Sequence, residues 1–519
     1  MLVIGDLSRL NALRYPEKPA LVMGGESLTY AELNRRANRL AHALAAAGIR
    51  DGDRVGLLAH NRLDYAVVTQ AVAKCGAILV PMNFRFGVEE VSRVLADAEP
   101  SVLFLESSFE RVVRQAIAHL AGPPRLIRLT EPGTGPGAQT PSDIPSAADL
   151  ARDQPQTEPA RAVDPQSPCV IMYTSGTTGA PKGVLVSHAT YFKMYLATAV
   201  ETRMRHDDVY LMAAPFFHAA GLNMALHQCL FMGSTGIVHR GSFDPEVILH
   251  LIETHRITLA ILVPTTLAML ALHPRIAHYD LTSLDKIFYG SMPIAPPMLA
   301  KAREVFTHAR FNQLYGSTEA GMVSVLSAED HERWSQATGR QALLTESRIV
   351  DGEGNPVAVG GVGEVIVNQR TMGMIGYWRN PEATRETIRD GWIYTGDLAR
   401  VEPEGFFTLV DRRKDVIVSG GENIYPKEVE NALASHPAVR EVAVFGVPHP
   451  LYGETVCAAV SLWPGQSATA AQLEEHCRAR LASYKRPRRV EFLDALPRNA
   501  SDKVQKTTLR RMFSDARSG

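Results

Sequence analysis

The chain has 519 residues, of which 45% are hydrophobic, 21% charged and 7% aromatic, so it is a globular protein with room for several core-sized units at roughly 150 residues each. Its 54 Lys and Arg residues balance 55 Asp and Glu residues to a formal net charge of -1. This balance leaves no bulk field that would gather nucleic acid or an acidic membrane, and we expect no nucleic acid partner.

The cysteines are widely scattered and form no C-x-x-C pair, which argues against a zinc site or a disulfide framework. They are Cys75, Cys169, Cys229, Cys457 and Cys477. The sequence also lacks a signal-peptide pattern and a run of about 18 uninterrupted apolar residues. We therefore expect a cytoplasmic protein without a membrane span.

Residues 20–120 alternate an amphipathic helical pattern, as in 30–48, with short β-branched runs at 54–58 and 77–80. This spacing is typical of βα units and predicts a layered α/β architecture. Residues 121–168 are rich in Pro, Gly, Thr, Gln and Ala and indicate a surface loop or a domain linker. The alternation resumes after Cys169, and a compact tail of about a hundred residues follows the charged run from Asp411 to Asp415. We expect a domain boundary at that run.

A short apolar segment at 170–173 leads into a loop of hydroxyls, glycines and one lysine. Glycines let backbone N–H groups approach phosphate oxygens, hydroxyls donate further hydrogen bonds, and a lysine adds positive charge. The loop is not a Walker A motif, because Pro181 precedes its lysine and Gly183 follows it. By composition alone a flexible Gly/Thr loop is the competing interpretation. The candidate phosphate-binding residues are Thr174, Ser175, Gly176, Thr177, Thr178, Gly179 and Lys182.

This loop resembles the nucleotide-binding signature of the adenylate-forming superfamily, which includes acyl- and aryl-CoA synthetases, beetle luciferases and the adenylation domains of peptide synthetases. Seven further segments match in the family's order, from Pro16 to Lys503. The resemblance implies an α/β fold with mixed α+β subdomains. A large N-terminal domain of layered sheets and helices, 1–412, would bind AMP and the acyl group. A small mobile α+β C-terminal domain, 413–519, would follow a hinge at Lys414.

Residues 214–221 are similar to the family segment whose aromatic and histidine side chains wall the acyl pocket. The resemblance implies that His218 lies beside the reacting carboxylate. A lone histidine is more often a hydrogen-bonded core residue, and only its place in the motif favours the site. In amino-acid-activating relatives this segment usually supplies an aspartate that binds the substrate ammonium. No aspartate stands in 214–221, which disfavours an amino acid substrate. The candidate acyl-pocket residues are His218, Ala219, Ala220, Gly221, Gly290 and Gly316.

Two further segments complete the nucleotide site by resemblance. In 289–293, Ser291 stands where the family more often has Gly and lies against adenine. In 312–319, Tyr315 would stack on adenine, Thr318 would face the α-phosphate, and Glu319 would hold Mg2+, a cation that prefers carboxylate and phosphate oxygen. Asp397 would accept hydrogen bonds from the ribose, and Arg412 would reach the nucleotide. Asn312, Gly316 and Ser317 join the ATP/AMP-binding set.

The C-terminal region resembles the part of the family that serves the second reaction step. Its candidate coenzyme A contacts are Ser419, Gly420, Gly421, Tyr452, Tyr484 and Arg486. Lys503 matches the adenylation lysine, with Asp502 in place of the usual Gly and Lys506 as a rival candidate. Asp411 also stands where the family more often has Gly.

The sequence therefore predicts an acid–thiol ligase that uses ATP, Mg2+ and coenzyme A. The acid would attack ATP to give an acyl-adenylate and pyrophosphate, and coenzyme A would then give acyl-CoA and AMP after domain alternation. Lys503, Thr318, Glu319 and His218 are the catalytic candidates. A stand-alone enzyme that loads a carrier protein and a luciferase-type oxidase are the alternatives. Whether the acid is fatty or aromatic, and whether the chain forms a homodimer, stay open.

Overall fold

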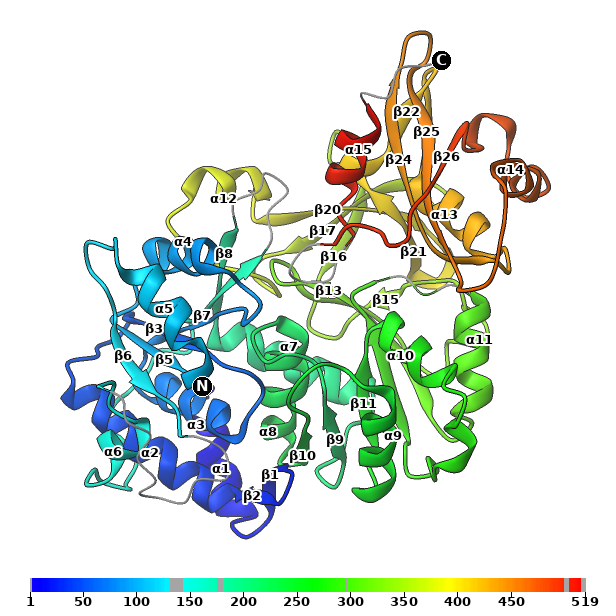
Figure 1. The fold of residues 1–519 in the computed structure, drawn as a ribbon. Helices are drawn as coiled ribbons and strands as arrows, with labels where there is room; N and C mark the ends of the chain where they lie inside the picture. The colour runs from blue at the N-terminus through cyan, green and yellow to red at the C-terminus, as the bar shows by residue number, and fades with distance from the viewer. Residues whose placement is uncertain are drawn as a thin grey trace.

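The computed structural model describes residues 2–130, 143–174, 181–292, 294, 296–498 and 504–514. A large α/β domain comprises the blue to yellow part of the chain, and a small α+β domain in orange and red stands on one side of it (Figure 1). The helices of the large domain are α1 (Asp6–Arg14), α2 (Tyr30–Ala46), α3 (Leu63–Lys74), α4 (Val88–Ala98), α5 (Glu110–Ile117), α6 (Ala147–Ala151), α7 (His188–Glu201), α8 (Gln228–Met232), α9 (Pro245–Thr254), α10 (Pro264–Ala271), α11 (Pro296–Val305) and α12 (Pro381–Thr387).

The first sheet of the large domain has seven strands in the order β18-β8-β7-β4-β3-β5-β6. Strands β7, β4, β3, β5 and β6 run parallel, so their carboxyl ends meet at one edge. The strands are β3 (Arg54–Leu58), β4 (Ile78–Pro81), β5 (Val102–Leu105), β6 (Arg125–Arg128), β7 (Pro168–Thr174), β8 (Lys182–Ser187) and β18 (Gly376–Tyr377).

The second sheet of the large domain has 14 strands and is parallel through β10, β9, β11, β12 and β13 before it turns antiparallel. Its strands are β1 (Pro19–Met23), β2 (Glu26–Thr29), β9 (Val209–Met212), β10 (Thr235–Val238), β11 (Leu259–Leu262), β12 (Lys286–Gly290), β13 (Arg310–Ser317), β14 (Gly321–Leu326), β15 (Gly339–Gln341), β16 (Ser347–Val350), β17 (Val362–Asn368), β19 (Ile388–Arg389), β20 (Trp392–Val401) and β21 (Phe406–Arg412).

Helices packed between the two sheets join them into one hydrophobic core. Every residue of α3 except Asp64 is buried, as expected of a helix covered on all sides. Helix α7 contacts β8 of the first sheet and β14 of the second. The same buried cluster includes Val55 of β3, Tyr210 of β9 and Phe288 of β12. The two sheets therefore present their carboxyl ends from one rigid body.

The small domain has a five-stranded sheet with its own core of Ile417, Val429, Val444 and Leu473, among others. Its elements are β22 (Ile417–Ser419), β23 (Glu422–Ile424), α13 (Pro426–Ala434), β24 (Val439–His449), β25 (Gly453–Leu462), α14 (Ala470–Arg478), β26 (Arg489–Phe492) and α15 (Lys506–Ser514). None of the described helices in either domain is long and apolar enough to cross a bilayer.

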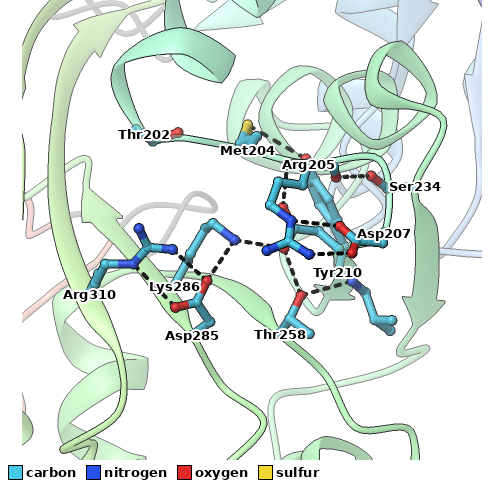
Figure 2. Close-up of polar contacts among 12 residues, drawn as sticks. Thr202, Met204, Arg205, Asp207, Tyr210, Ser234, Thr258, Asp285, Lys286 and Arg310 are labelled. Carbon is cyan, nitrogen blue, oxygen red and sulfur yellow. Dashed lines mark hydrogen bonds and ion pairs between the residues drawn. The ribbon is translucent and has the colours of Figure 1, made fainter.

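A buried ion pair joins the amino ends of neighbouring strands in the second sheet (Figure 2). The Lys286 ammonium lies 2.7 Å from Asp208 and 2.8 Å from Asp285, and its side chain is 1% exposed. Thr258 donates to the same Asp208 oxygen at 3.0 Å, and Arg310 pairs with Asp285 at 2.6 Å. Burial alone would raise the pKa of Asp285, but Arg310 and Lys286 outweigh it and lower that pKa.

The strongest local patterns are confirmed by the structure. Helix α2 covers most of the pattern at 30–48, β3 matches 54–58, and β4 lies within one residue of 77–80. Residues 121–168, predicted to be a surface loop or a domain linker, also contain strand β6 and helix α6. Strand β6 was missed because it is short and only one of its residues, Ile127, is buried.

Replacing Lys286 with Ala should lower the free energy of unfolding by about 3–5 kcal/mol, because it leaves the buried Asp208 carboxylate without its ammonium. Urea titration followed by tryptophan fluorescence would measure the loss. The matched control is Lys301→Ala, which removes an exposed pair to Glu304 at 3.3 Å and should change stability by less than about 1 kcal/mol. Equal effects of the two substitutions would contradict the structural role of Lys286.

Candidate active site

Two candidate residues flank the phosphate loop at the edge of the first sheet. Thr174 ends β7, Lys182 begins β8, and the two residues are direct cross-strand partners. The loop residues between them lie outside the described residues, and these are Ser175, Gly176, Thr177, Thr178 and Gly179. Thr174 and Lys182 therefore lie at the same end of the sheet as the carboxyl ends of its parallel strands.

Glu319 lies in the turn between β13 and β14 and faces the first sheet. Its Oε1 accepts hydrogen bonds from the Thr174 hydroxyl at 3.4 Å and from the Tyr377 hydroxyl at 3.3 Å. Burial and the Glu319 carboxylate raise the pKa of Tyr377, so this phenol stays a donor. The Lys182 ammonium lies 5.1 Å from the centre of the Tyr377 ring. One carboxylate from the second sheet thus accepts from two hydroxyls of the first sheet, and one of these, Thr174, borders the phosphate loop.

Tyr315, Asp397 and Arg412 form a hydrogen-bonded chain on the second sheet. The Tyr315 hydroxyl donates to Asp397 Oδ2 at 2.8 Å, and Arg412 Nε donates to Oδ1 at 3.2 Å. Asp397 and Arg412 are cross-strand partners on β20 and β21. Burial, with Asp397 second, raises the pKa of Tyr315 well above its usual range. The structure therefore brings together three candidate nucleotide-binding residues, although Tyr315 is 82 residues and Arg412 is 15 residues from Asp397 in the sequence.

The turn that carries Thr318 and Glu319 is braced from within. Ser317 Oγ accepts a hydrogen bond from the Ala320 amide at 3.0 Å. Only glycine fits at position 316, because the Cβ of any other residue would lie 2.1 Å from the Gly321 carbonyl oxygen. Asn312 is buried, and its Oδ1 accepts from the Ala328 amide at 3.2 Å, so in this structure its side chain braces the strand. These contacts position Thr318 and Glu319 at the end of β13.

Gly290 and Ser291 follow at the end of the neighbouring strand, β12. A Cβ on Gly290 would lie 2.1 Å from the Leu314 carbonyl oxygen, so the two strands can approach only with glycine. Ser291 has a φ of 64°, in the left-handed region that glycine adopts without strain. This backbone explains why a glycine is more usual at this position, and the serine stores strain of about 1–3 kcal/mol there.

Four acyl-pocket candidates, His218, Ala219, Ala220 and Gly221, follow β9 and run into the first turn of a π-helix, η2 (Ala220–His227). His218 Nδ1 accepts a hydrogen bond from the Ala220 amide at 3.3 Å, and the His218 amide donates to the Pro215 carbonyl at 3.1 Å. A Cβ on Gly221 would lie 2.0 Å from that same carbonyl oxygen. The segment is thus folded tightly on itself, and π-helical turns of this kind occur often at functional sites.

Asn61 is a positioning residue that the sequence reasoning missed. It is 5% exposed, follows β3 of the first sheet, and clamps the acyl-pocket segment after β9 of the second. Its amide donates to the Ala214 carbonyl at 2.9 Å, and its Oδ1 accepts from the Phe216 amide at 2.8 Å. The available signal was an amide side chain directly after a buried parallel strand.

Glu364 of β17 is a second missed residue. It accepts from the Gly396 amide at 2.9 Å, next to Asp397, and pairs with Arg413 at 3.0 Å, next to the expected hinge. It therefore ties the candidate ribose carboxylate to the segment that leads into the small domain.

The coenzyme A candidates divide into two groups within the small domain. Ser419 pairs with Gly453, and the Gly420 amide donates to the Tyr452 carbonyl at 2.9 Å, so Ser419, Gly420, Gly421 and Tyr452 gather at the closed end of the β24–β25 hairpin. The cation over the Tyr452 ring is Arg488, at 4.6 Å, which was not predicted. Tyr484 is exposed, and Arg486 donates to the Leu481 carbonyl at 3.1 Å. Lys503 lies outside the described residues.

A large α/β domain of two sheets with a small α+β domain beside it is the architecture of the adenylate-forming enzymes. Residues 9–378 match the model of the AMP-binding enzyme, and residues 428–503 match the model of the AMP-binding enzyme C-terminal domain. The chain belongs to the AMP-binding enzyme family.

Individual relatives cover almost the whole chain. A feruloyl-CoA synthase from an Amycolatopsis species is 41% identical over 96% of both chains. The fatty acid–[acyl-carrier-protein] ligase ScoC from Streptomyces coeruleorubidus is 38% identical over 97% of this chain and 95% of that protein. The crystal structure of ATP-bound MatB from Rhodopseudomonas palustris has a TM-score of 0.89 at 30% identity, with 99% of both chains covered.

Replacing Asn61 with Ala should raise the KM for the acid roughly tenfold and leave the KM for ATP within about twofold, because only the acyl-pocket segment loses its two buried hydrogen bonds. Initial rates of pyrophosphate release with each substrate varied would measure both constants. Asn38→Ala is the matched control, since Asn38 is 1% exposed and donates at 2.8 Å to the Gln156 carbonyl, away from the site. If both KM values rise together in Asn61→Ala, the clamp does not act on the acyl pocket.

Proposed function

We propose that this chain is an ATP-dependent carboxylic acid–CoA ligase that converts an acid and ATP to acyl-AMP and pyrophosphate, and then acyl-AMP and coenzyme A to acyl-CoA and AMP. The observation that carries the proposal is the meeting of Thr174, Glu319 and Tyr377 at 3.3 to 3.4 Å, beside the ends of the phosphate loop. The acid is a fatty or an aryl acid, since relatives named for both kinds match over nearly the full chain.

Glu319 has the donor chemistry that Mg2+ prefers, a carboxylate that faces the phosphate site. Among the described residues no group of three or more His, Cys, Asp or Glu side chains could hold a metal ion. Glu319 would hold Mg2+ together with phosphate oxygens of bound ATP. When bound it neutralises charge on the phosphates of ATP.

In the first half-reaction an oxygen of the acid attacks the α-phosphorus, and the bond to pyrophosphate breaks as the new phosphorus–oxygen bond forms. The role of the chain is positioning and charge stabilisation, without a covalent intermediate on the enzyme. Lys182 and Lys503 supply positive charge, Thr318 donates to the α-phosphate, and His218 borders the reacting carboxylate. Tyr315 stacks on adenine, while Asp397 accepts from the ribose hydroxyls and Arg412 orients that carboxylate.

In the second half-reaction the thiolate of coenzyme A attacks the acyl carbon, and AMP leaves with the electron pair of the carbon–oxygen bond. The thiol proton passes to solvent. The closed end of the β24–β25 hairpin, where Gly420 and Tyr452 gather, points away from the large domain (Figure 1). The small domain must therefore rotate about Lys414 before that end can face the adenylate.

One alternative acceptor has a specific observation in its favour. The relative ScoC is named for transfer to an acyl carrier protein and is 38% identical to this chain. A carrier presents its thiol on a phosphopantetheine arm, so the same adenylate could serve either acceptor. The feruloyl-CoA synthase and ScoC are named as a synthase and a ligase, which favours ligation over the luciferase-type alternative.

Two further proposals concern the setting of the reaction. All five cysteines lie in the described part of the chain and are buried free thiols, which supports a reducing cytoplasm. A homodimer is the oligomeric state to test, by sedimentation of the purified chain.

The acceptor is tested by supplying acid, MgATP and either coenzyme A or a carrier protein that bears a free phosphopantetheine thiol. We expect acyl-CoA and AMP with coenzyme A, and accumulation of enzyme-bound acyl-AMP when no thiol is present. Mass spectrometry of the acyl products separates the outcomes. Transfer to the carrier alone would replace the proposal by the carrier-loading reaction, and no adenylate from any fatty or aryl acid would refute ligase activity altogether.

Replacing Lys503 with Ala should slow adenylation by about 10² to 10³, the usual effect of losing one preorganised charge. Thioester formation from preformed acyl-adenylate should stay near the parental rate, because this lysine acts only in the first step. Rapid-quench measurement of each half-reaction would show the contrast.

The rival lysine supplies the control for that test. Lys506 pairs with Glu430 at 2.8 Å, so Lys506→Arg keeps the small domain intact while an arginine cannot replace a catalytic lysine. We expect both half-reactions to survive in Lys506→Arg. Loss of adenylation in Lys506→Arg with normal rates in Lys503→Ala would show that Lys506 is the catalytic residue.

A further inference from the structure

Asp411 makes a hydrogen bond that crosses the expected hinge. It lies near the end of β21 in the large domain, three residues before Lys414. Its Oδ2 accepts from the backbone amide of Lys427 at 2.7 Å, and Lys427 is in the first turn of α13 in the small domain. Its Oδ1 accepts from the Arg412 amide at 2.7 Å, which orients the carboxylate toward the helix.

Helix α13 depends on this contact for its N-terminal cap. The first amides of a helix have no partner within the helix and carry partial positive charge, so a side-chain oxygen normally covers them. Tyr425 precedes the helix, and in the described structure its side chain makes no such bond. The capping carboxylate comes instead from the other domain.

The surroundings of Asp411 raise the pKa of its carboxyl on balance, so the carboxylate is less well stabilised here than in water. Burial raises the pKa of its carboxyl, Lys506 and the amides of Lys427 and Arg412 oppose that rise, and Glu430 adds to it. Glu430 in turn pairs with Lys506 at 2.8 Å and lies 3.8 Å from the Lys427 ammonium. The contact is thus satisfied but weakly stabilised, as suits an interaction that must break.

The two partners lie on opposite sides of Lys414 in the chain, so any rotation of the backbone at Lys414 moves the Lys427 amide away from the Asp411 carboxylate. The hydrogen bond can exist in only one of the two domain orientations. In the orientation seen here the turn at Gly420 points away from the large domain. This is the orientation in which the thiol-transfer residues are disengaged.

We propose that the Asp411–Lys427 hydrogen bond is a latch that holds the small domain in the orientation for acyl-adenylate formation and opens before thiol transfer. The inference rests on the proposed function, and it makes Asp411 a positioning residue for the first half-reaction. A glycine, the more usual residue of the family at this position, has no side chain to form the latch.

The test is Asp411→Gly, with the rates of adenylation and of thiol transfer from preformed adenylate measured separately. Loss of a helix cap shifts an equilibrium by roughly 2- to 30-fold, so we expect the ratio of thiol transfer to adenylation to rise by about tenfold. Asp411→Asn keeps an acceptor oxygen for the Lys427 amide and should restore most of the parental ratio. A change in stability alone would lower both rates and leave the ratio unmoved.

Asp351→Gly is the matched control. Asp351 Oδ1 also accepts two backbone amides, Glu353 and Asn355, each at 2.9 Å, but both belong to its own turn in the large domain. The ratio of thiol transfer to adenylation in Asp351→Gly should equal that of the parental enzyme. An unchanged ratio in Asp411→Gly would overturn the latch, whereas a parental enzyme that forms no adenylate would overturn the proposed function instead.

Discussion

The buried pair of Lys286 and Asp208 is the interaction on which the alignment of the second sheet depends (Figure 2). A lysine with a side chain that is 1% exposed can stay charged only if carboxylates surround it, and those carboxylates lie at the amino ends of neighbouring strands. Because parallel strands rise by a constant distance per residue, alignment at one end sets the level of the other end. Gly290 at the end of β12 is therefore level with Leu314 of β13, five residues before Glu319.

The site itself is assembled across the two sheets rather than within one. Glu319 of the second sheet accepts hydrogen bonds from Thr174 and Tyr377 of the first sheet. In the other direction, Asn61 of the first sheet donates to the Ala214 carbonyl, which follows strand β9 of the second sheet. These contacts need the two sheets to form one body, which helix α3, buried at every residue except Asp64, helps to provide. The Glu319 carboxylate and the acyl-pocket segment are therefore held in place by both sheets. Pre-organisation of this kind lets charge stabilisation act without rearrangement during the reaction.

Local patterns predicted much of the fold, because the signals for α2 and β3 lie within the segments themselves: an amphipathic period and a β-branched run. The nucleotide candidates came from resemblance, and the structure brings Tyr315, Asp397 and Arg412 into one chain of contacts. Asn61 and Glu364 were not foreseen, since their roles arise from segments that meet only after folding. The left-handed backbone of Ser291 was equally invisible, because a serine gives no signal for a positive φ.

A domain that must occupy two orientations in each turnover limits how strong any contact between domains can be. A ligand shifts a two-state equilibrium only by its difference in affinity for the two states, and about 5.5 kcal/mol is needed to reverse a ratio of 99 to 1. A buried ion pair like that of Lys286, if it joined the domains, would add several kcal/mol to the free energy that a ligand must supply to shift the equilibrium. The hydrogen bond from the Lys427 amide to Asp411 is a smaller contribution, of about 1 kcal/mol for a helix cap. Release of pyrophosphate and binding of a thiol substrate can therefore overcome it, while the bond still favours the orientation in which the adenylate is made.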